Sequence, residues 1–125
     1  MAIIISNTAT EPIYEQIARQ IKDMILRGEM AEGSLLPSIR SLARELQVSV
    51  ITTKRAYDEL EKEGFLETVG GKGTFVAGQS RELLRERKLA MVEEKLAEAV
   101  TECRRLGISP AEAAHILQLL FREEE

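Results

Sequence analysis

The segment Gly70–Thr74, GGKGT, places one lysine among three glycines between two short apolar runs. This combination suits a loop that cradles a phosphate group, or a β-hairpin tip that approaches a polyanion closely. A P-loop requires Ser or Thr directly after the lysine and a helix beginning there, but Gly73 follows Lys72 and β-forming residues come next. The flanks therefore favour a hairpin with strands at Phe65–Thr68 and Thr74–Ala77, whose tip either contacts a partner or is an ordinary surface turn.

Basic side chains gather upstream of this hairpin, although the chain as a whole is acidic. The 125 residues carry 17 Lys and Arg against 21 Asp and Glu, a net charge of −4. Four basic residues stand between residues 34 and 57, with Glu45 as the single acidic one. They are Arg40, Arg44, Lys54 and Arg55. A local basic face on an acidic protein suits selective binding of nucleic acid, because a uniformly basic chain would hold any polyanion.

Apolar residues at steps of three and four predict the helices that position this basic stretch. The first helix begins at Thr10 or Glu11, with Pro12 in its first turn, and ends at Gly28. It follows an extended lead-in, in which the three isoleucines at positions 3–5 are free to pack on a neighbouring element.

A short helix and a longer one come next. Ser38 caps the short helix, and the segment QVS separates it from a second helix that extends from Ser49 or Val50 to Glu63. The expected buried residues are Ile39, Leu42, Ala43 and Leu46 on the short helix, and Thr53, Ala56, Tyr57 and Leu60 on the second. Those expected to project from the second helix are Ile51, Thr52, Lys54 and Arg55. Two short helices joined by about three residues, the second basic at its start, are typical of a helix-turn-helix.

A helix-turn-helix followed directly by a hairpin is a winged arrangement. Its second helix presents its first residues to base edges in the major groove, and the hairpin tip reaches a neighbouring groove or a phosphate. The residues expected to contact DNA are Ser38, Arg40, Arg44, Ser49, Val50, Ile51, Thr52, Lys54, Arg55, Gly71, Lys72, Gly73 and Thr74. We expect Val50 and Ile51 to meet thymine methyl groups. A solvated face explains Arg40 and Arg44 if they are taken alone, and Lys54 and Arg55 have Asp58 and Glu59 within reach as helical ion-pair partners.

The composition changes after a short linker at residues 78–80. A long charged helix is predicted over Arg81–Arg105, ended by Gly107, and a further helix begins with Ser109 as N-cap, Pro110 at the first position and Glu112 completing a capping box. Apolar residues repeat along both helices as in a helix-packing seam, and the hairpin is too small to cover them. Pairing with a second chain is expected at Leu89, Val92, Leu96, Val100, Cys103, Ile116, Leu117, Leu120 and Phe121. An intramolecular helical pair in a monomer is the alternative.

Other classes of function find little support in the sequence. One cysteine, Cys103, allows no internal disulfide, and neither a membrane span nor a signal peptide is present, so a cytoplasmic protein is expected. Cys103 fits a small buried hydrophobe, and His115, the single histidine, has no second His or Cys at ligand spacing, so no metal and no cofactor are expected. No nucleophile–base pair suggests an enzyme. Residues 79–125 leave little room for an effector pocket, although a small site at a dimer interface stays open.

The sequence also resembles a known family. The segments PIYEQIARQIKDMILRGEMAEGSLLPSIRSLARELQVS and KRAYDELEKEGFLETVGGKGTFV resemble the N-terminal domain of GntR-family bacterial transcription regulators, and RAYDELEKEG with the two-helix tail is most similar to the YtrA-like branch. The resemblance covers about Glu11 to Val76. It implies a dimeric repressor of a short operon, often one encoding a membrane transporter.

By this resemblance Arg40 holds a phosphate or a base edge, Lys54 and Arg55 lie on the recognition helix, and residues 71–74 form the wing. Three positions depart from common family patterns. Val50 stands where many members have Arg, Gln47 where many have Gly, and Thr53 where an aliphatic residue is usual.

The prediction is therefore a mainly α protein with a small β-hairpin (α+β). A winged helix-turn-helix domain occupies residues 1–78, and a C-terminal two-helix dimerisation element occupies residues 79–125. Its expected function is sequence-specific, repressive DNA binding to an inverted repeat. The alternative is a protein-interaction module built on a winged-helix fold that does not bind DNA.

Overall fold

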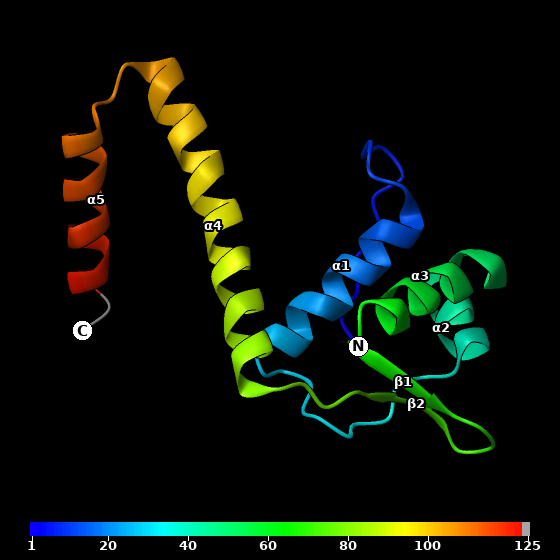
Figure 1. The fold of residues 1–125 in the computed structure, drawn as a ribbon. Helices are drawn as coiled ribbons and strands as arrows, with labels where there is room; N and C mark the ends of the chain where they lie inside the picture. Colours follow the sequence, from blue (N-terminus) through cyan, green and yellow to red (C-terminus); the bar gives the residue numbers. More distant parts are fainter. Residues whose placement is uncertain (124–125) are drawn as a thin grey trace. The chain divides into compact units, whose positions relative to one another are not determined.

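The computed structural model describes residues 1–123, and the chain divides into two compact units, Met1–Leu84 and Arg85–Glu125. In chain order the elements are α1 (Ile13–Leu26), α2 (Ile39–Leu46), α3 (Val50–Lys62), β1 (Leu66–Val69), β2 (Gly73–Val76), α4 (Arg81–Leu106) and α5 (Pro110–Glu123) (Figure 1). The predicted fold class, mainly helical with one small hairpin, is confirmed.

The core of the first unit lies where α1, α2 and β1 contact α3. Its largest fully buried side chains are Ile17, Ile21, Leu42, Thr53 and Leu60. The predicted inner face of α3 is confirmed, since Thr53, Ala56, Tyr57 and Leu60 are all buried. On α2, Leu42 and Ala43 are buried as predicted, but Ile39 and Leu46, at the two ends of this short helix, are only half-buried.

Buried polar groups in this core have partners. The hydroxyl of Thr53 donates to the carbonyl of Ser49 at 3.1 Å, which allows a β-hydroxyl residue to stand where an aliphatic one is usual. The hydroxyl of Tyr57 donates to the carbonyl of Pro37 at 2.7 Å. Burial raises the pKa of Tyr57, and the nearby charge of Glu45 raises it further. Tyr57 is thus a core residue, as predicted, and it fixes the segment that leads into α2.

The predicted cap of α2 is confirmed, since the Ser38 hydroxyl accepts from the amide of Ser41. Ser49 caps α3 in the same way, its hydroxyl accepting from the amide of Thr52, although no cap was predicted there. Gly28 ends α1 with φ of +78°. The start of α1 was predicted two or three residues too early, because Pro12 takes the N-cap position with extended ψ and the first helical residue is Ile13.

Gln47, in the turn between α2 and α3, adopts a backbone conformation that is unfavourable for a residue with a β-carbon. Among residues 1–123, Gln47 is the only non-glycine residue with positive φ, +57°. A β-carbon in this left-handed region costs about 1–2 kcal/mol, while glycine loses roughly 0.5–1 kcal/mol of chain entropy on folding.

We therefore expect Gln47→Gly to raise the free energy of unfolding by about 0.5–1 kcal/mol, as measured by urea denaturation. Gln47→Ala retains a β-carbon and serves as the matched control. It should give no comparable gain, and equal stabilisation by both variants would contradict this account of the turn.

The hairpin is antiparallel. Its strand β1 begins one residue later than predicted, and β2 begins one residue earlier. Leu66 pairs with Val76 and Val69 pairs with Gly73. Residues 33–36, predicted as loop, pair with β2 through an isolated bridge between Leu35 and Phe75, outside the two-stranded sheet. The amide of Leu36 donates to the carbonyl of Thr74, and the amide of Val76 donates to the carbonyl of Ser34. This bridging segment begins with Gly33 and is followed by Pro37, so it contains no strand pattern long enough to recognise.

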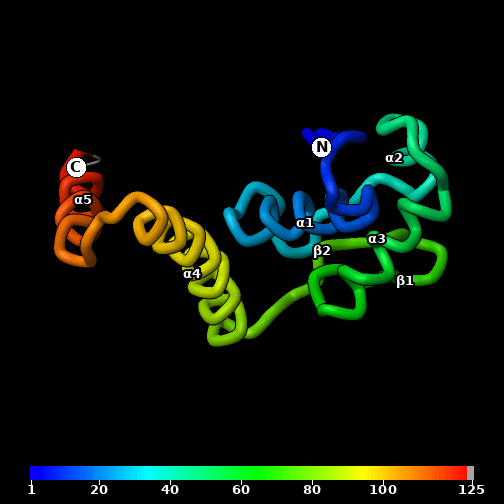
Figure 2. Tube along the Cα trace, turned by 90° about the horizontal axis from the view of Figure 1, so that it is seen from above, coloured from blue at the N-terminus to red at the C-terminus, as the bar shows by residue number. Residues whose placement is uncertain are grey.

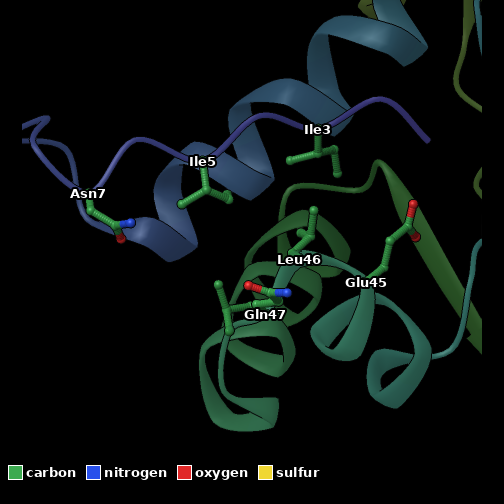
Figure 3. A pocket seen from close by; sticks show the side chains of 7 residues that line it. Ile3, Ile5, Asn7, Glu45, Leu46 and Gln47 are labelled. Atoms are coloured by element: carbon green, nitrogen blue, oxygen red, sulfur yellow. The ribbon is translucent and has the colours of Figure 1, made fainter.

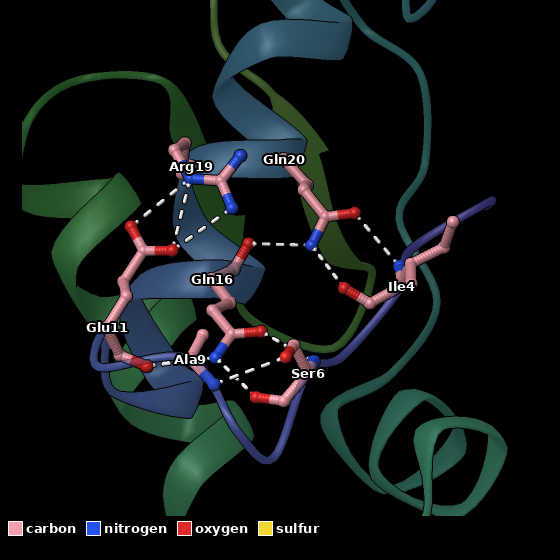
Figure 4. Close-up of polar contacts among 7 residues, drawn as sticks. All are labelled: Ile4, Ser6, Ala9, Glu11, Gln16, Arg19 and Gln20. Carbon is pink, nitrogen blue, oxygen red and sulfur yellow. Dashed lines mark hydrogen bonds and ion pairs between the residues drawn. The ribbon is translucent and has the colours of Figure 1, made fainter.

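The N-terminal lead-in is an extended segment that lies beside α1 (Figure 2). Two glutamine side chains hold it, as Figure 4 shows. Gln20 accepts from the amide of Ile4 and donates to its carbonyl, and Gln16 does the same for Ser6. Of the isoleucines expected to pack, Ile3 is buried, whereas Ile4 is 80% exposed because its side chain points away from α1.

A pocket of about 320 Å³ lies between this segment and the end of α2 (Figure 3). Its walls are Ile3, Ile5 and Asn7 on one side and Glu45, Leu46, Gln47 and Val48 on the other.

In the second unit the predicted helix signals are confirmed. Gly107, with φ of +71°, follows α4, and α5 begins at Pro110. Ser109 and Glu112 form the capping box, each bonding the other's backbone amide at 3.1 Å. The backbone bond from Ser109, followed by the side-chain bond, lowers the pKa of Glu112. No described residue of α4 or α5 is buried.

Candidate nucleic-acid interface

The first turn of α3 presents apolar side chains to solvent. Val50 is 47% exposed and Ile51 is 81% exposed. Helix N-termini carry partial positive charge and unpaired amides, which favour contact with phosphate. Thr52, predicted to project from the helix, is half-buried, and its hydroxyl accepts from the Ser49 hydroxyl at 2.8 Å. Val50 and Ile51 are therefore the apolar side chains that this turn leaves exposed.

Arg40 and Arg44 lie on the exposed face of α2, in the first and second turns after the Ser38 cap. Within residues 1–123, neither side chain forms a hydrogen bond or an ion pair. An exposed guanidinium without a protein partner keeps all five N–H donors for phosphate or a base edge. The Ser38 and Ser49 hydroxyls, in contrast, already accept from the helix backbones that they cap.

Lys54 is bound to a neighbour on its own helix. Its Nζ lies 2.8 Å from Oδ2 of Asp58, one turn further along α3. This hydrogen bond raises the pKa of Lys54. Both side chains are more than half exposed, so the pair contributes little to stability and opens readily when phosphate competes.

Arg55 is held by a residue of a different helix. Its guanidinium lies over the ring of Tyr14, 3.7 Å from the centroid, and its Nη2 donates to the Tyr14 hydroxyl at 3.1 Å. The Tyr14 hydroxyl in turn donates to Oε1 of Glu15 at 3.1 Å, a bond that raises the pKa of Tyr14. In the described part of the chain Arg55 makes no ion pair with Glu59, which the sequence spacing had indicated as a possible partner.

The hairpin tip is a tight turn closed by the Lys72 amide, which donates to the Val69 carbonyl at 2.9 Å. Gly71 has φ of +76° and Gly73 has φ of +119°, so both positions require glycine. A β-carbon at Gly73 would also lie 3.0 Å from Cδ1 of Leu35 in the bridging segment 33–36. The turn leaves the Lys72 side chain exposed, beyond the end of the paired strands.

The predicted site residues therefore fall into three groups. The first group is exposed and makes no side-chain hydrogen bond or ion pair with residues 1–123; its members are Arg40, Arg44, Val50, Ile51 and Lys72, together with the exposed glycines Gly71 and Gly73 of the wing. Ser38, Ser49, Thr52 and Thr74 use their hydroxyls within the fold, Thr74 against Thr68 at 3.1 Å. Lys54 and Arg55 have partners that a polyanion must share or displace.

Tyr14 is the one residue of this region that sequence reasoning missed. It stands beside Ile13 in the first turn of α1, away from the buried face, and its contact with α3 depends on how the two helices cross. The one available signal is an aromatic residue on the polar side of an amphipathic helix.

Among residues 1–123, no three His, Cys, Asp or Glu side chains gather closely enough to hold a metal ion. No helix of the described chain is long and apolar enough to cross a membrane.

Proteins similar to this chain in sequence are bacterial transcription regulators. The model of the family "Bacterial regulatory proteins, gntR family" matches residues 13–76. The HTH-type transcriptional repressor YtrA of Bacillus subtilis is 38% identical over 106 residues, which are 85% of this chain and 82% of YtrA.

Solved structures agree as well. A GntR family transcriptional regulator from Listeria monocytogenes is 30% identical with a TM-score of 0.73, covering 91% of this chain and 97% of that one. The DNA-binding domain of AraR in complex with operator ORX1 is 28% identical with a TM-score of 0.55, covering 62% of this chain and 96% of that domain.

Proposed function

This chain belongs to the GntR family of bacterial regulatory proteins, and from that premise we propose that it is a dimeric cytoplasmic repressor of a short operon, bound to an inverted-repeat operator. DNA-binding transcription regulation, rather than enzymatic catalysis, is the activity of the family. The observation that carries the proposal is one unit in which exposed Val50 and Ile51, the arginines of α2 and the lysine of the wing are all available to DNA.

The contacts divide by chemistry. Arg40, Arg44 and Lys72 offer charge and are assigned to phosphates, which fix the position of the protein on the duplex. Val50 and Ile51 offer only methyl groups, so they are assigned to thymine methyls in the major groove. A valine where many relatives have arginine removes a donor that reads guanine, so an A·T-rich half-site is expected.

Dimerisation is proposed through the second unit. The apolar residues assigned to the interface on α4 and α5, apart from Cys103, are between 42% and 69% exposed in the single chain. They are Leu89, Val92, Leu96, Val100, Ile116, Leu117, Leu120 and Phe121. Cys103 is half-buried. An exposed apolar surface of this kind marks an interaction site, and a second copy supplies the same seam in twofold symmetry.

Selection of binding sites from random duplex DNA, carried out at two salt concentrations, tests the proposal. Recovery of an A·T-rich inverted repeat, with an affinity that falls steeply with salt, is the expected result. A single half-site without symmetry would contradict the dimeric operator. Failure of the folded protein to select any sequence would contradict operator binding.

Asp58→Asn is expected to tighten operator binding about three- to fivefold. The exposed Lys54–Asp58 pair stabilises the free protein by about 0.3–0.5 kcal/mol in each chain, and this free energy is lost when Lys54 turns to DNA. The Asn variant removes this loss from both chains of a dimer, which gives the expected gain in affinity. Affinity is measured by fluorescence anisotropy on the selected operator. In a Lys54→Ala background the gain should largely disappear. An equal gain with and without Lys54 would mean that Asp58 acts only by repelling phosphate.

A further inference from the structure

The contact between Tyr14 and Arg55 joins the first turn of α1 to the second turn of the recognition helix. We infer that Tyr14 is a positioning residue for DNA binding, which holds the Arg55 guanidinium ready for a phosphate beside the major groove. This inference rests on the proposed operator binding and adds a residue outside the helix-turn-helix and the wing.

The geometry fixes the guanidinium in three ways. One face lies on the tyrosine ring, 3.7 Å from its centroid. The Nη2 atom donates to the hydroxyl oxygen at 3.1 Å. The hydroxyl hydrogen is directed to Glu15, so a lone pair of the same oxygen is free to accept from Arg55. The orientation of Arg55 is thus set before any ligand arrives.

The remaining donors of Arg55 are available. A guanidinium has five N–H donors, and within the described residues only one of them is bonded to protein. Arg55 follows Ile51 by four residues, so it lies on the same side of α3, about 6 Å further along the helix axis. When the start of α3 enters the major groove, a side chain at this level meets the phosphate backbone that forms the wall of the groove.

By positioning Arg55, Tyr14 reduces the side-chain entropy that is lost on DNA binding and so increases the affinity for DNA. A long basic side chain loses rotamer freedom when it binds a phosphate, and Arg55 has already lost much of it in the folded protein. Glu15 and Glu59 lie close enough to act on the Tyr14 hydroxyl, and their charges oppose a nearby phosphate. A fixed guanidinium keeps its positive charge between these carboxylates and the DNA.

The test measures operator affinity, its salt dependence and protein stability for single and double variants of the full-length protein. Arg55→Ala should weaken binding and reduce the slope of log K against log salt by about 1.8, or about 0.9 for each chain of a dimer. Tyr14→Leu keeps an apolar contact between α1 and α3 and should weaken binding roughly tenfold with the slope unchanged, because the charge stays. Tyr14→Phe, which keeps the ring, should recover part of that loss.

The double variant separates positioning from structure. In an Arg55→Ala background, Tyr14→Leu should cause no further loss of operator affinity. Equal losses in both backgrounds, or a change in stability with unchanged affinity of the folded protein, would overturn the inference. Arg27→Ala removes the same charge at the exposed end of α1 and is the control for net charge. Failure of the wild-type protein to bind would instead overturn the proposed function.

Discussion

Leu96→Glu is expected to convert the protein to a monomer and to weaken binding to the full inverted repeat by at least about 100-fold. Leu96 lies in the middle of the α4 seam and is 44% exposed in the single chain. In a symmetric dimer two such glutamates face a largely apolar interface, where burying unpaired carboxylates costs several kcal/mol. Linkage of two DNA-binding units raises overall affinity about 10²- to 10⁴-fold, and this gain is lost with the dimer.

Sedimentation equilibrium gives the mass, and anisotropy on one half-site and on the complete operator gives the affinities. Ala97→Glu adds the same charge one residue later, off the predicted seam, and should leave the dimer intact. Binding of the Leu96→Glu monomer to an isolated half-site should match that of the wild-type protein. A dimer that survives Leu96→Glu would place the interface elsewhere.

Arg40→Ala combined with Lys72→Ala is expected to weaken operator binding by on the order of 100-fold or more near physiological salt. A dimer lacking both side chains loses four proposed phosphate contacts, so the slope of log K against log salt should fall by about 3.6. Because phosphate contacts carry no sequence information, binding to operator and to random DNA should weaken together.

A control with the same change in net charge is Arg27→Ala combined with Lys62→Ala, which removes two exposed charges at the far ends of α1 and α3. Its affinity should change little. If the control and the test variant lost equal affinity, the effect would come from total charge. If the slope stayed constant in the test variant, Arg40 and Lys72 would not touch phosphate.

Local chemistry explains which parts of the fold the sequence predicted well. Helix caps at Ser38 and Ser109 depend on residues at most four positions apart, and both were placed correctly. The inner face of α3 was predicted equally well, because helical periodicity alone places Thr53, Ala56, Tyr57 and Leu60 together.

Long-range pairing explains what the sequence missed. The pairing of residues 33–36 depends on β2, some 40 positions later, and these few residues carry no alternating pattern. Tyr14 and Arg55 are 41 positions apart, and no spacing rule brings them together. Helical spacing therefore indicated Asp58 as a partner for Lys54, but the partner that holds Arg55 was missed.

The pairing of residues 33–36 with β2 fixes the position of the wing relative to α2. Residues 33–36 pair with the wing, Ser38 caps α2, and only Pro37 lies between them. Proline fixes its own φ, and Tyr57 binds its carbonyl. The wing and α2, which are both proposed to contact DNA, are thus joined by a stiff connector of one residue, so the distance between them is fixed. We expect a duplex whose groove width does not match this distance to deform on binding, so that local DNA shape contributes to recognition.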